Sequence, residues 1–84
     1  MNPRLLPAPQ AAHIDLHACT VFDAEERLIL LLEGLPKEVK EEEVVHGYSR
    51  GTALKRMVRT GFYHWRVKAW QADLNPGITW LILK

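Results

Sequence analysis

A leucine-rich stripe in the N-terminal half constrains the fold of this chain more than any other feature of its sequence. Thr20 fits an N-cap, with Asp23 three positions later as in a capping box, and Gly34 followed by Pro36 is a typical helix end. Between these signals, apolar residues recur at the spacing of one helix face: Ala24, Leu28, Leu31, Leu32 and Leu35. The sequence therefore predicts one amphipathic helix that must cover an apolar surface built by the rest of the chain.

Strand patterns flank this helix. Residues 12–19 alternate apolar Ile14 and Leu16 with polar neighbours, the period of a strand with one buried face. A second short strand is expected over residues 43–45 and ends at His46, after a charged connection at residues 37–42. Residues 67–74 and 78–83 predict two more strands. The turn Asn75-Pro76-Gly77 joins them, with glycine at the position that favours a positive φ.

A second helix is predicted to begin at Thr52, after a loop at residues 47–51. Its expected apolar stripe consists of Leu54, Met57, Val58 and Phe62. The order β-α-β-α-β-β then predicts a two-layer α/β sandwich, with a mixed four-stranded sheet and both helices on one face. The 84 residues suffice for one domain, expected at 12–84, after a proline-rich flexible tail at 1–11.

Composition excludes several classes of protein. The longest aliphatic run, residues 28–32, is far shorter than the roughly 20 apolar residues of a membrane helix. The prolines near the N-terminus interrupt any secretory signal pattern. A single cysteine, Cys19, excludes an internal disulfide framework, and the four histidines match no standard zinc spacing. We expect a cytoplasmic protein without a membrane partner.

Charge is distributed unevenly along the chain. Residues 1–43 hold nine acids and four basic residues, whereas residues 44–84 hold seven basic residues and one acid, Asp73. This division predicts that the second half faces a polyanion, although the two halves could simply neutralise each other. In the second helix, Lys55, Arg56 and Arg59 lie beside the apolar stripe. Together with Arg50, they predict a basic strip along that helix.

Two short motifs could carry chemistry. Asp15 and His17 are two residues apart on a strand, so the carboxylate could orient the imidazole for acid–base catalysis. The alternative is an aspartate that caps the following turn, beside a histidine that only packs. The second motif, residues 46–52, runs from His46 through a glycine-bearing loop into a helix, a typical anion-binding arrangement. Its expected phosphate-binding residues are Gly47, Ser49, Arg50, Gly51 and Thr52, with Lys55, Arg56 and Arg59 beyond them.

Together these motifs resemble the Smr (small MutS-related) domain family. Its L-D-L-H-G motif is echoed by residues 14–18, its H-G-x-G-x-G motif by residues 46–51, and its closing N-x-G-x-T motif by residues 75–79. The resemblance covers residues 13–84 and is to the short bacterial members that consist of the domain alone. At two positions the sequence departs from the family pattern, because Ala18 and Ser49 stand where the family has glycines.

The resemblance implies a nucleic-acid-binding domain with endonuclease activity on RNA or DNA, a hydrolase. It implies catalytic roles for Asp15, His17 and His46, with a divalent metal as an optional cofactor and no small-molecule substrate. The departures at Ala18 and Ser49 remove backbone freedom, which keeps open a non-catalytic module that docks on structured RNA, a ribonucleoprotein or a protein partner. Exposed tryptophans and the acidic first helix would serve a protein partner; the oligomeric state is left open.

Overall fold

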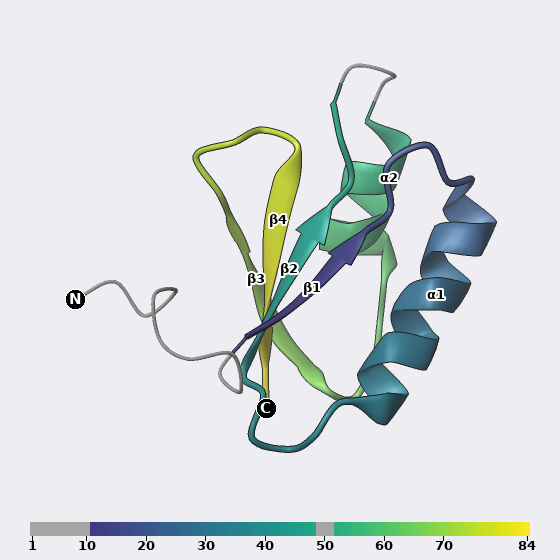
Figure 1. Cartoon of the computed structure of the whole chain (residues 1–84). Coiled ribbons are helices and arrows are strands. Elements are labelled where there is room, and N and C mark those ends of the chain that lie inside the picture. The colour runs from purple at the N-terminus through teal and green to yellow at the C-terminus, as the bar shows by residue number, and fades with distance from the viewer. Residues whose placement is uncertain (1–10, 49–51) are drawn as a thin grey trace.

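The computed structural model describes residues 11–48 and 52–84. Within these ranges no helix has the length and apolar character needed to cross a membrane. The predicted tail at 1–11 falls outside the described residues except for Ala11, which opens the first strand. The elements follow the predicted order: β1 (Ala11–Asp15), α1 (Val21–Gly34), β2 (Glu41–Val45), α2 (Ala53–Arg56), a π-helical segment η3 (Met57–Gly61), β3 (Val67–Ala72) and β4 (Ile78–Leu83) (Figure 1).

The four strands form one mixed sheet in the order β1-β2-β4-β3. β1 and β2 are parallel, with Ile14 opposite Val44, whereas β4 runs antiparallel to both of its neighbours, with Thr79 opposite Val44. Both helices cover the same face of this sheet (Figure 1). The predicted two-layer α/β sandwich is therefore confirmed.

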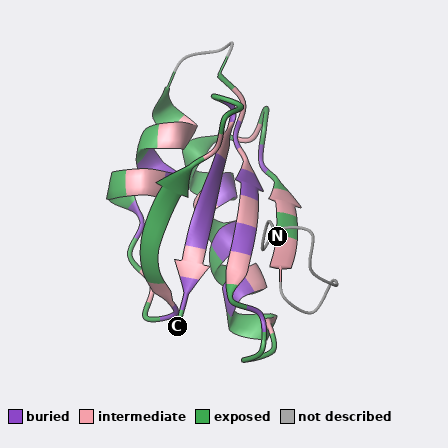
Figure 2. Ribbon diagram, turned by 90° about the vertical axis from the view of Figure 1, so that its left-hand side faces the viewer, coloured by how far each residue is buried: buried purple, intermediate pink, exposed green. Residues whose placement is uncertain are grey.

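The core lies between this covered face and the helices. On the sheet side, alternate residues of the two central strands are buried, among them Val44, Leu81 and Leu83. On the helix side, α1 contributes Ala24, Leu28 and Leu32, all at most 1% exposed. Leu31 and Leu35 of the predicted stripe are only half-buried. Figure 2 shows the same concentration of burial on β4, beside a largely exposed β3. Each fully buried leucine contributes about 2 kcal/mol.

Two strand boundaries differ from the prediction. β1 ends at Asp15 rather than at residue 19, because Ala18 has a φ of 69°, which turns the chain toward α1. β2 begins at Glu41 rather than at residue 43, so part of the expected charged connection belongs to the sheet. Pairing with β1 and β4 overrides the low strand propensity of glutamate here. As a result, Glu42 is completely buried.

The second helix also differs from the expected regular helix. Only four α-helical residues precede η3, where the backbone widens to π-helical turns. The Thr60 hydroxyl donates to the Arg56 carbonyl oxygen at 3.0 Å, a bond back along the helix that favours such distortion. Met57, Val58 and Phe62 are nevertheless buried as predicted.

Arg66 joins the segment after α1 to the C-terminal residue through side-chain hydrogen bonds. Its guanidinium donates to the carbonyl oxygens of Leu35, Pro36 and Val39, at 3.2, 2.9 and 2.7 Å, and to that of Lys84 at 3.4 Å. The residue is only 4% exposed. Arg66 therefore serves the fold and not the polyanion-facing surface predicted for the second half of the chain.

Candidate nucleic-acid site

The C-terminal ends of β1 and β2 meet at one edge of the sheet, as their parallel pairing requires. We call this the histidine edge, because His17 follows β1 and His46 follows β2 there. A hollow of about 840 Å³ opens at this edge, between the start of α1, the start of α2 and the β3–β4 turn. Its lining combines polar and apolar residues: His17, Ala18, Cys19, Thr20, Val21, Val45, His46, Gly47, Tyr48, Ala53, Leu54, Asn75, Gly77 and Ile78.

Asp15 and His17 form the pair that the sequence predicts. The His17 Nδ1–H donates to Asp15 Oδ1 at 2.6 Å, and the His17 backbone N–H donates to the same oxygen at 3.0 Å. These bonds lower the pKa of the Asp15 carboxyl, the side-chain bond contributing most. The carboxylate thereby fixes one imidazole tautomer and leaves Nε2 able to accept a proton. With its side chain 66% exposed, His17 is accessible to a ligand in the hollow.

His46 lies in a different environment. It is 4% exposed, and both ring nitrogens have partners. Nδ1 lies 2.8 Å from the Gly47 carbonyl oxygen, which can only accept, so Nδ1 carries the proton. Nε2 then accepts from the Thr79 hydroxyl at 2.8 Å. Burial is the largest of the effects that lower the pKa of His46, which keeps the ring neutral.

Arg59 completes a relay of hydrogen bonds through these groups. Its Nε–H donates to Thr79 Oγ1 at 2.8 Å, so the Thr79 hydroxyl accepts from Arg59 while it donates to His46. The Arg59 guanidinium also lies 4.6 Å from the ring centroid of Trp70. Arg59 is thus half-buried against the sheet, whereas the prediction placed it on an exposed basic strip. The π-helical turns of η3 alter its angular position relative to a regular α-helix.

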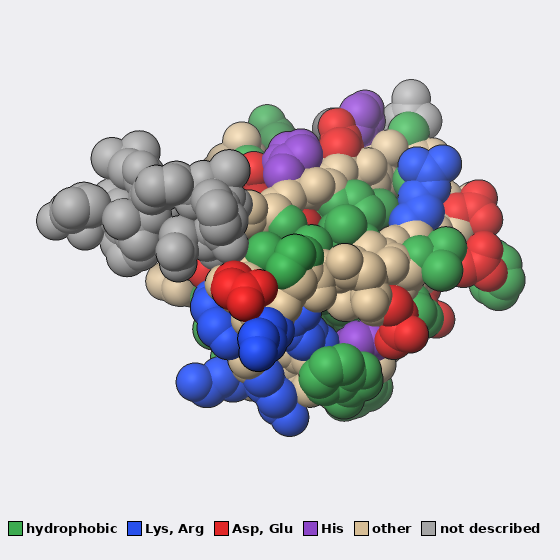
Figure 3. All heavy atoms as spheres, turned by 60° about the horizontal axis from the view of Figure 1, so that its bottom comes forward, with side chains coloured by type: hydrophobic (Ala, Val, Ile, Leu, Met, Phe, Trp, Pro, Cys, Tyr) green, Lys and Arg blue, Asp and Glu red, His purple; other side chains and the backbone are tan. Residues whose placement is uncertain are grey.

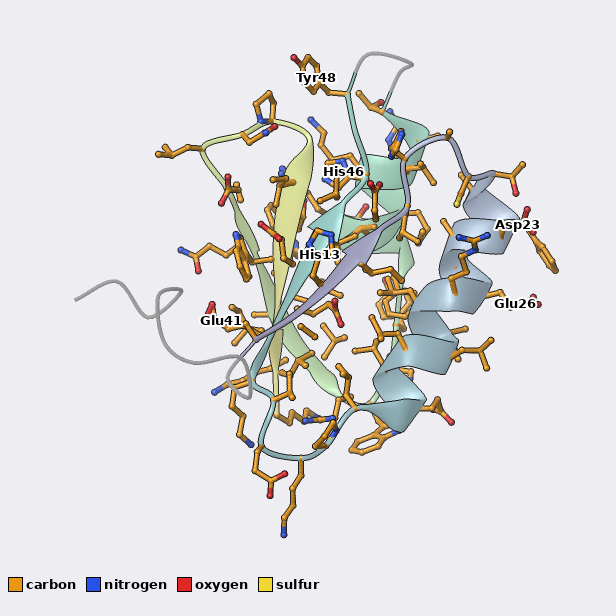
Figure 4. The ribbon with its side chains drawn as sticks, in the orientation of Figure 1. His13, Asp23, Glu26, Glu41, His46 and Tyr48 are labelled. Carbon is orange, nitrogen blue, oxygen red and sulfur yellow. The ribbon has the colours of Figure 1, made fainter. Side chains whose placement is uncertain are left out.

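The strand register explains why the two histidines differ. Asp15 pairs with Val45, and the Leu16 N–H donates to the Val45 carbonyl oxygen at 2.7 Å. Side chains alternate along each strand, so His46 follows Val44 to the helix-covered face, while His17 follows Asp15 to the other face. The two rings share an edge of the sheet but belong to opposite faces. In Figure 4, His46 lies at the end of β2, and Tyr48 lies beyond it at the tip.

Gly47 and Gly77 bring the end of β2 into contact with the β3–β4 turn. The Gly77 carbonyl oxygen accepts from the N–H groups of His46 and Gly47, at 2.8 and 3.0 Å. Gly47 has a φ of 76°, which favours glycine. Gly77 lacks the positive φ expected for it; instead, a Cβ there would lie 3.2 Å from the Gly47 Cα. The close approach of the two backbones therefore favours glycine at position 77.

The remaining predicted binding residues are only partly placed. Ser49, Arg50 and Gly51 lie outside the described residues. Arg56 is exposed and its guanidinium is 3.4 Å from the Thr52 hydroxyl, while Lys55 is half-buried near the start of the helix. Other basic side chains gather at the far end of the molecule, where Figure 3 shows a group of them. Lys40 and Lys84 belong to that end, since their backbones bond to Leu83 and Arg66 respectively.

No group of three or more His, Cys, Asp or Glu side chains suited to a metal ion occurs within residues 11–48 and 52–84. At the histidine edge, Asp15 and His17 bond to each other, and both nitrogens of His46 are engaged. The described residues therefore do not fit a resident metal ion, and no chemical step is derived through one.

Sequence reasoning missed the contribution of the last hairpin to the site. Thr79 holds His46, and Gly77 holds the backbone of the β2 end, yet both were assigned only to a turn and a strand. Asn75 completes the arrangement, because its Oδ1 accepts from the Gly77 N–H at 2.8 Å. The closing N-x-G-x-T motif contains all three residues, and it was the sequence feature from which their contribution to the site could have been predicted. It marks a structural support of the histidine edge as well as a turn.

Comparison with known proteins gives one informative likeness. No family model and no curated protein matches the sequence. Among solved structures, the chain is similar to the Smr domain of MutS2 from Thermus thermophilus, with 22% sequence identity and a TM-score of 0.76. The match covers 87% of this chain and 98% of that domain. The chain therefore has the fold of an Smr domain, in agreement with the resemblance of its motifs.

Proposed function

We propose that this chain binds RNA or DNA at the histidine edge and cleaves a phosphodiester there with the Asp15–His17 pair. The observation that carries the proposal is the 2.6 Å bond between Asp15 and His17 at an accessible hollow. The Smr fold and the family motifs make nucleic acid the expected ligand. The span 44–72 contains no carboxylate, which suits a phosphate backbone. The proposal assigns the chain to the cytoplasm, where its single thiol, Cys19, stays reduced.

In the proposed reaction, His17 acts as a general base. Nε2 takes the proton of the attacking hydroxyl, either water or a ribose 2′-OH, while a new P–O bond forms. The P–O bond to the leaving oxygen breaks, and that oxygen takes up a proton from solvent water. Asp15 holds the tautomer and stabilises the imidazolium that forms. Lys55 and Arg56 supply positive charge to neighbouring phosphates.

His46 has two candidate roles. It could act as the acid–base partner of His17 across the phosphodiester, in line with the catalytic role that the family resemblance implies. The bonds of its two nitrogens to Gly47 and Thr79 favour a second role, in which it fixes the backbone of the phosphate-facing loop. We favour this positioning role, because a fully bonded, buried imidazole has no nitrogen left for the substrate.

Cleavage is tested with labelled single- and double-stranded RNA and DNA, with Mg²⁺ and with a chelator. We expect His17→Ala to reduce cleavage by about 10²- to 10⁴-fold while binding persists, the usual effect of removing a general base. His13→Ala is the matched control, because His13 is an exposed histidine on β1 that also bonds a carboxylate, Glu43, at 2.7 Å. If the wild-type protein leaves every substrate intact under both conditions, the catalytic part of the proposal is wrong.

Binding is tested by its dependence on salt. Replacing Lys55 and Arg56 with alanine should weaken affinity about tenfold and make the salt dependence shallower by about one to two released ions. The matched control replaces Lys37 and Lys84, two exposed lysines remote from the histidine edge. Equal loss from both double variants would show attraction by overall charge alone. Affinity that does not change with salt would contradict nucleic-acid binding altogether.

A binding module without catalysis is the second candidate. The backbone of Ala18 favours this candidate. Ala18 has a strained φ of 69° at a position where the family has glycine, and its methyl group belongs to the lining of the hollow. In that case, His17→Ala would weaken binding to structured RNA and no variant would change the substrate's length. The cleavage assay separates the two candidates directly.

A further inference from the structure

The outer face of α1 is unusually apolar for a helix that already buries its other side. Ala24, Leu28 and Leu32 pack on the sheet, which accounts for one stripe of the helix. On the opposite side, Phe22 is 73% exposed and Leu30 is 69% exposed, with Ile29 beside them at 37%. A helix that is apolar on two sides ordinarily has a partner on each. Within the described ranges, nothing packs over this second stripe.

The stripe continues onto the segment after η3. His64 Nε2 lies 2.8 Å from Glu33 Oε2, which joins this segment to the last turn of α1. The His64 ring stacks on Trp65, with 5.7 Å between the ring centroids, and Trp65 is 69% exposed. A large aromatic ring therefore borders the C-terminal end of the stripe. We define the α1 surface as the apolar side chains of Phe22, Ile29, Leu30 and Trp65 together with the carboxylates of α1.

The charge of this surface is negative. α1 carries four carboxylates (Asp23, Glu25, Glu26 and Glu33) and one guanidinium (Arg27). No Lys or Arg nitrogen of the described residues lies within 4.0 Å of any of these carboxylates. In Figure 4, Asp23 and Glu26 project from the side of α1 that faces away from the sheet. The apolar stripe and the carboxylates of Asp23 and Glu26 thus lie on the same accessible face.

We infer that the α1 surface docks a basic amphipathic helix of a partner protein. Apolar area favours a protein ligand, and carboxylates that lack a Lys or Arg partner favour lysine and arginine beside the apolar stripe of that ligand. The same acids repel nucleic acid and anionic lipid. They also oppose a symmetric dimer through this face, because a two-fold axis would bring the acids of one copy against those of the other. The 14 residues of α1 span about 21 Å, which matches about four turns of a partner helix.

The test uses a synthetic peptide of about 18 residues, made of leucine and lysine with leucines at i, i+3, i+4 and i+7. Binding is followed by the backbone amide signals of α1 and the indole N–H signal of Trp65. The variant Phe22→Ser with Leu30→Ser removes the apolar stripe and leaves every charge in place. Leu74→Ser is the matched control, because Leu74 is fully exposed in the turn after β3, remote from α1. Both replaced side chains are exposed, so the double variant should keep its circular dichroism spectrum.

We expect saturable shifts on α1 and Trp65, at least about tenfold weaker binding in the double variant, and unchanged binding in Leu74→Ser. A second variant, Glu25→Gln with Glu26→Gln, should weaken binding and reduce its dependence on salt. Equal binding of a scrambled peptide of the same composition would overturn the inference, since only general charge attraction would remain. So would undiminished binding in the serine variant. Self-association of the free protein that the serine variant abolishes would make a second copy the occupant.

The inference is independent of the proposed nucleic-acid site. The α1 surface and the histidine edge use different residues, and the serine variant leaves Asp15, His17 and the relay in place. Nucleic-acid binding should therefore be equal in the wild-type protein and in the serine variant. A loss of nucleic-acid binding in that variant would contradict the assignment of the α1 surface to a protein partner.

Discussion

The two ends of β2 hold buried polar side chains in opposite circumstances. At one end, His46 is 4% exposed and both of its nitrogens are hydrogen-bonded. At the other end, Glu42 is fully buried and, among the described residues, neither carboxyl oxygen has a partner. Burial, reinforced by the neighbouring Glu43, raises the pKa of Glu42 to about 8. The same strand therefore carries a satisfied polar group beside the candidate site and an unsatisfied one in the core.

The difference comes from what β4 places opposite each residue. Thr79, near the His46 end, offers a hydroxyl that can both donate and accept. Leu81 is the cross-strand partner of Glu42 and offers only an aliphatic chain. A polar side chain in a sheet core is stabilising where a neighbouring strand supplies its complement, and destabilising where none does. The candidate site lies at the end where the complement exists, which keeps its backbone fixed.

The largest effect is expected from Glu42→Gln, which removes the ionisable group and nearly preserves its shape. Between pH 4.5 and about 8, the unfolded chain loses the Glu42 proton while the folded chain keeps it. Stability therefore falls as pH rises through this window. At about 1.4 kcal/mol per unit, the variant should be more stable than wild type by about 3 kcal/mol at pH 7. Urea unfolding at pH 4.5 and pH 7 measures the difference.

At pH 4.5 the two proteins should differ little, because the carboxyl is protonated in the folded state and half protonated in the unfolded state. Glu41→Gln is the matched control, since Glu41 is a half-buried neighbour on the opposite face of β2. A stability difference for Glu42→Gln that stays constant with pH would contradict the raised pKa. In that case the ionisation of Glu42 would not account for the difference between the two ends of β2.

A smaller effect, in this case a loss of stability, is expected from Thr79→Val, which makes the His46 end resemble the Glu42 end. The change leaves the Arg59 Nε–H and the His46 Nε2 without their common partner, at a cost of about 1–3 kcal/mol. Thr79→Ser keeps the hydroxyl and should retain the relay, losing only the packing of one methyl group. Urea unfolding of both variants at pH 7 separates the hydrogen bonds from the packing. Equal losses would show that the relay contributes nothing to stability.

Acidification should destabilise the His46 end. Because burial lowers the pKa of His46, the unfolded chain binds a proton before the folded chain does as pH falls below about 6.5. The neutral His46 ring therefore contributes to the free energy of unfolding above that pH, and this contribution is lost at lower pH. The dependence on pH is opposite to that of Glu42, whose contribution is lost as pH rises. Titration of the ring signals by NMR in the Glu42→Gln background isolates the effect. A midpoint for His46 at or above 6.5 would refute the neutral, buried assignment.

The smallest effect is expected from Ala18→Gly at the turn between β1 and α1. Ala18 has a φ of 69°, in the left-handed region where a Cβ is strained. Glycine relieves that strain but makes the unfolded chain more flexible, so the net gain should be about 0.5–1 kcal/mol. Ala72→Gly, in exposed β3, lacks a positive φ and should be destabilising. Thermal unfolding compares the two, and a loss in both would argue against strain at Ala18.

Local patterns in the sequence predicted the order of elements, the sheet and the histidine edge. Periods of two and of three to four residues are properties of short segments, and parallel strands place their ends together wherever they pair. The same patterns predicted Asp15 and His17 as a pair, because two residues apart on a strand means the same face.

Features that depend on distant partners were not predictable in the same way. The partner of His46, Thr79, is 33 positions away, and a shift of one residue in register would reverse which face the histidine occupies. The burial of Glu42 follows from strand pairing that opposes the preference of glutamate. Arg59 and Arg66 counted as surface charge in the sequence, yet long-range acceptors hold both of them against the fold. Contacts between residues far apart in the sequence decided each case.

The position of β4 in the centre of the sheet has a consequence for biosynthesis. It is the last strand in the described chain, yet it supplies the pairing partner of both β2 and β3. While residues 78–83 remain inside the ribosome, β2 has only β1 beside it and exposes a complete hydrogen-bonding edge. The emerging chain can form α1 and the β1–β2 pair, but its sheet closes only after β4 emerges. Nascent chains of this protein therefore present an open β-edge to chaperones or to one another until residue 83 has left the exit tunnel.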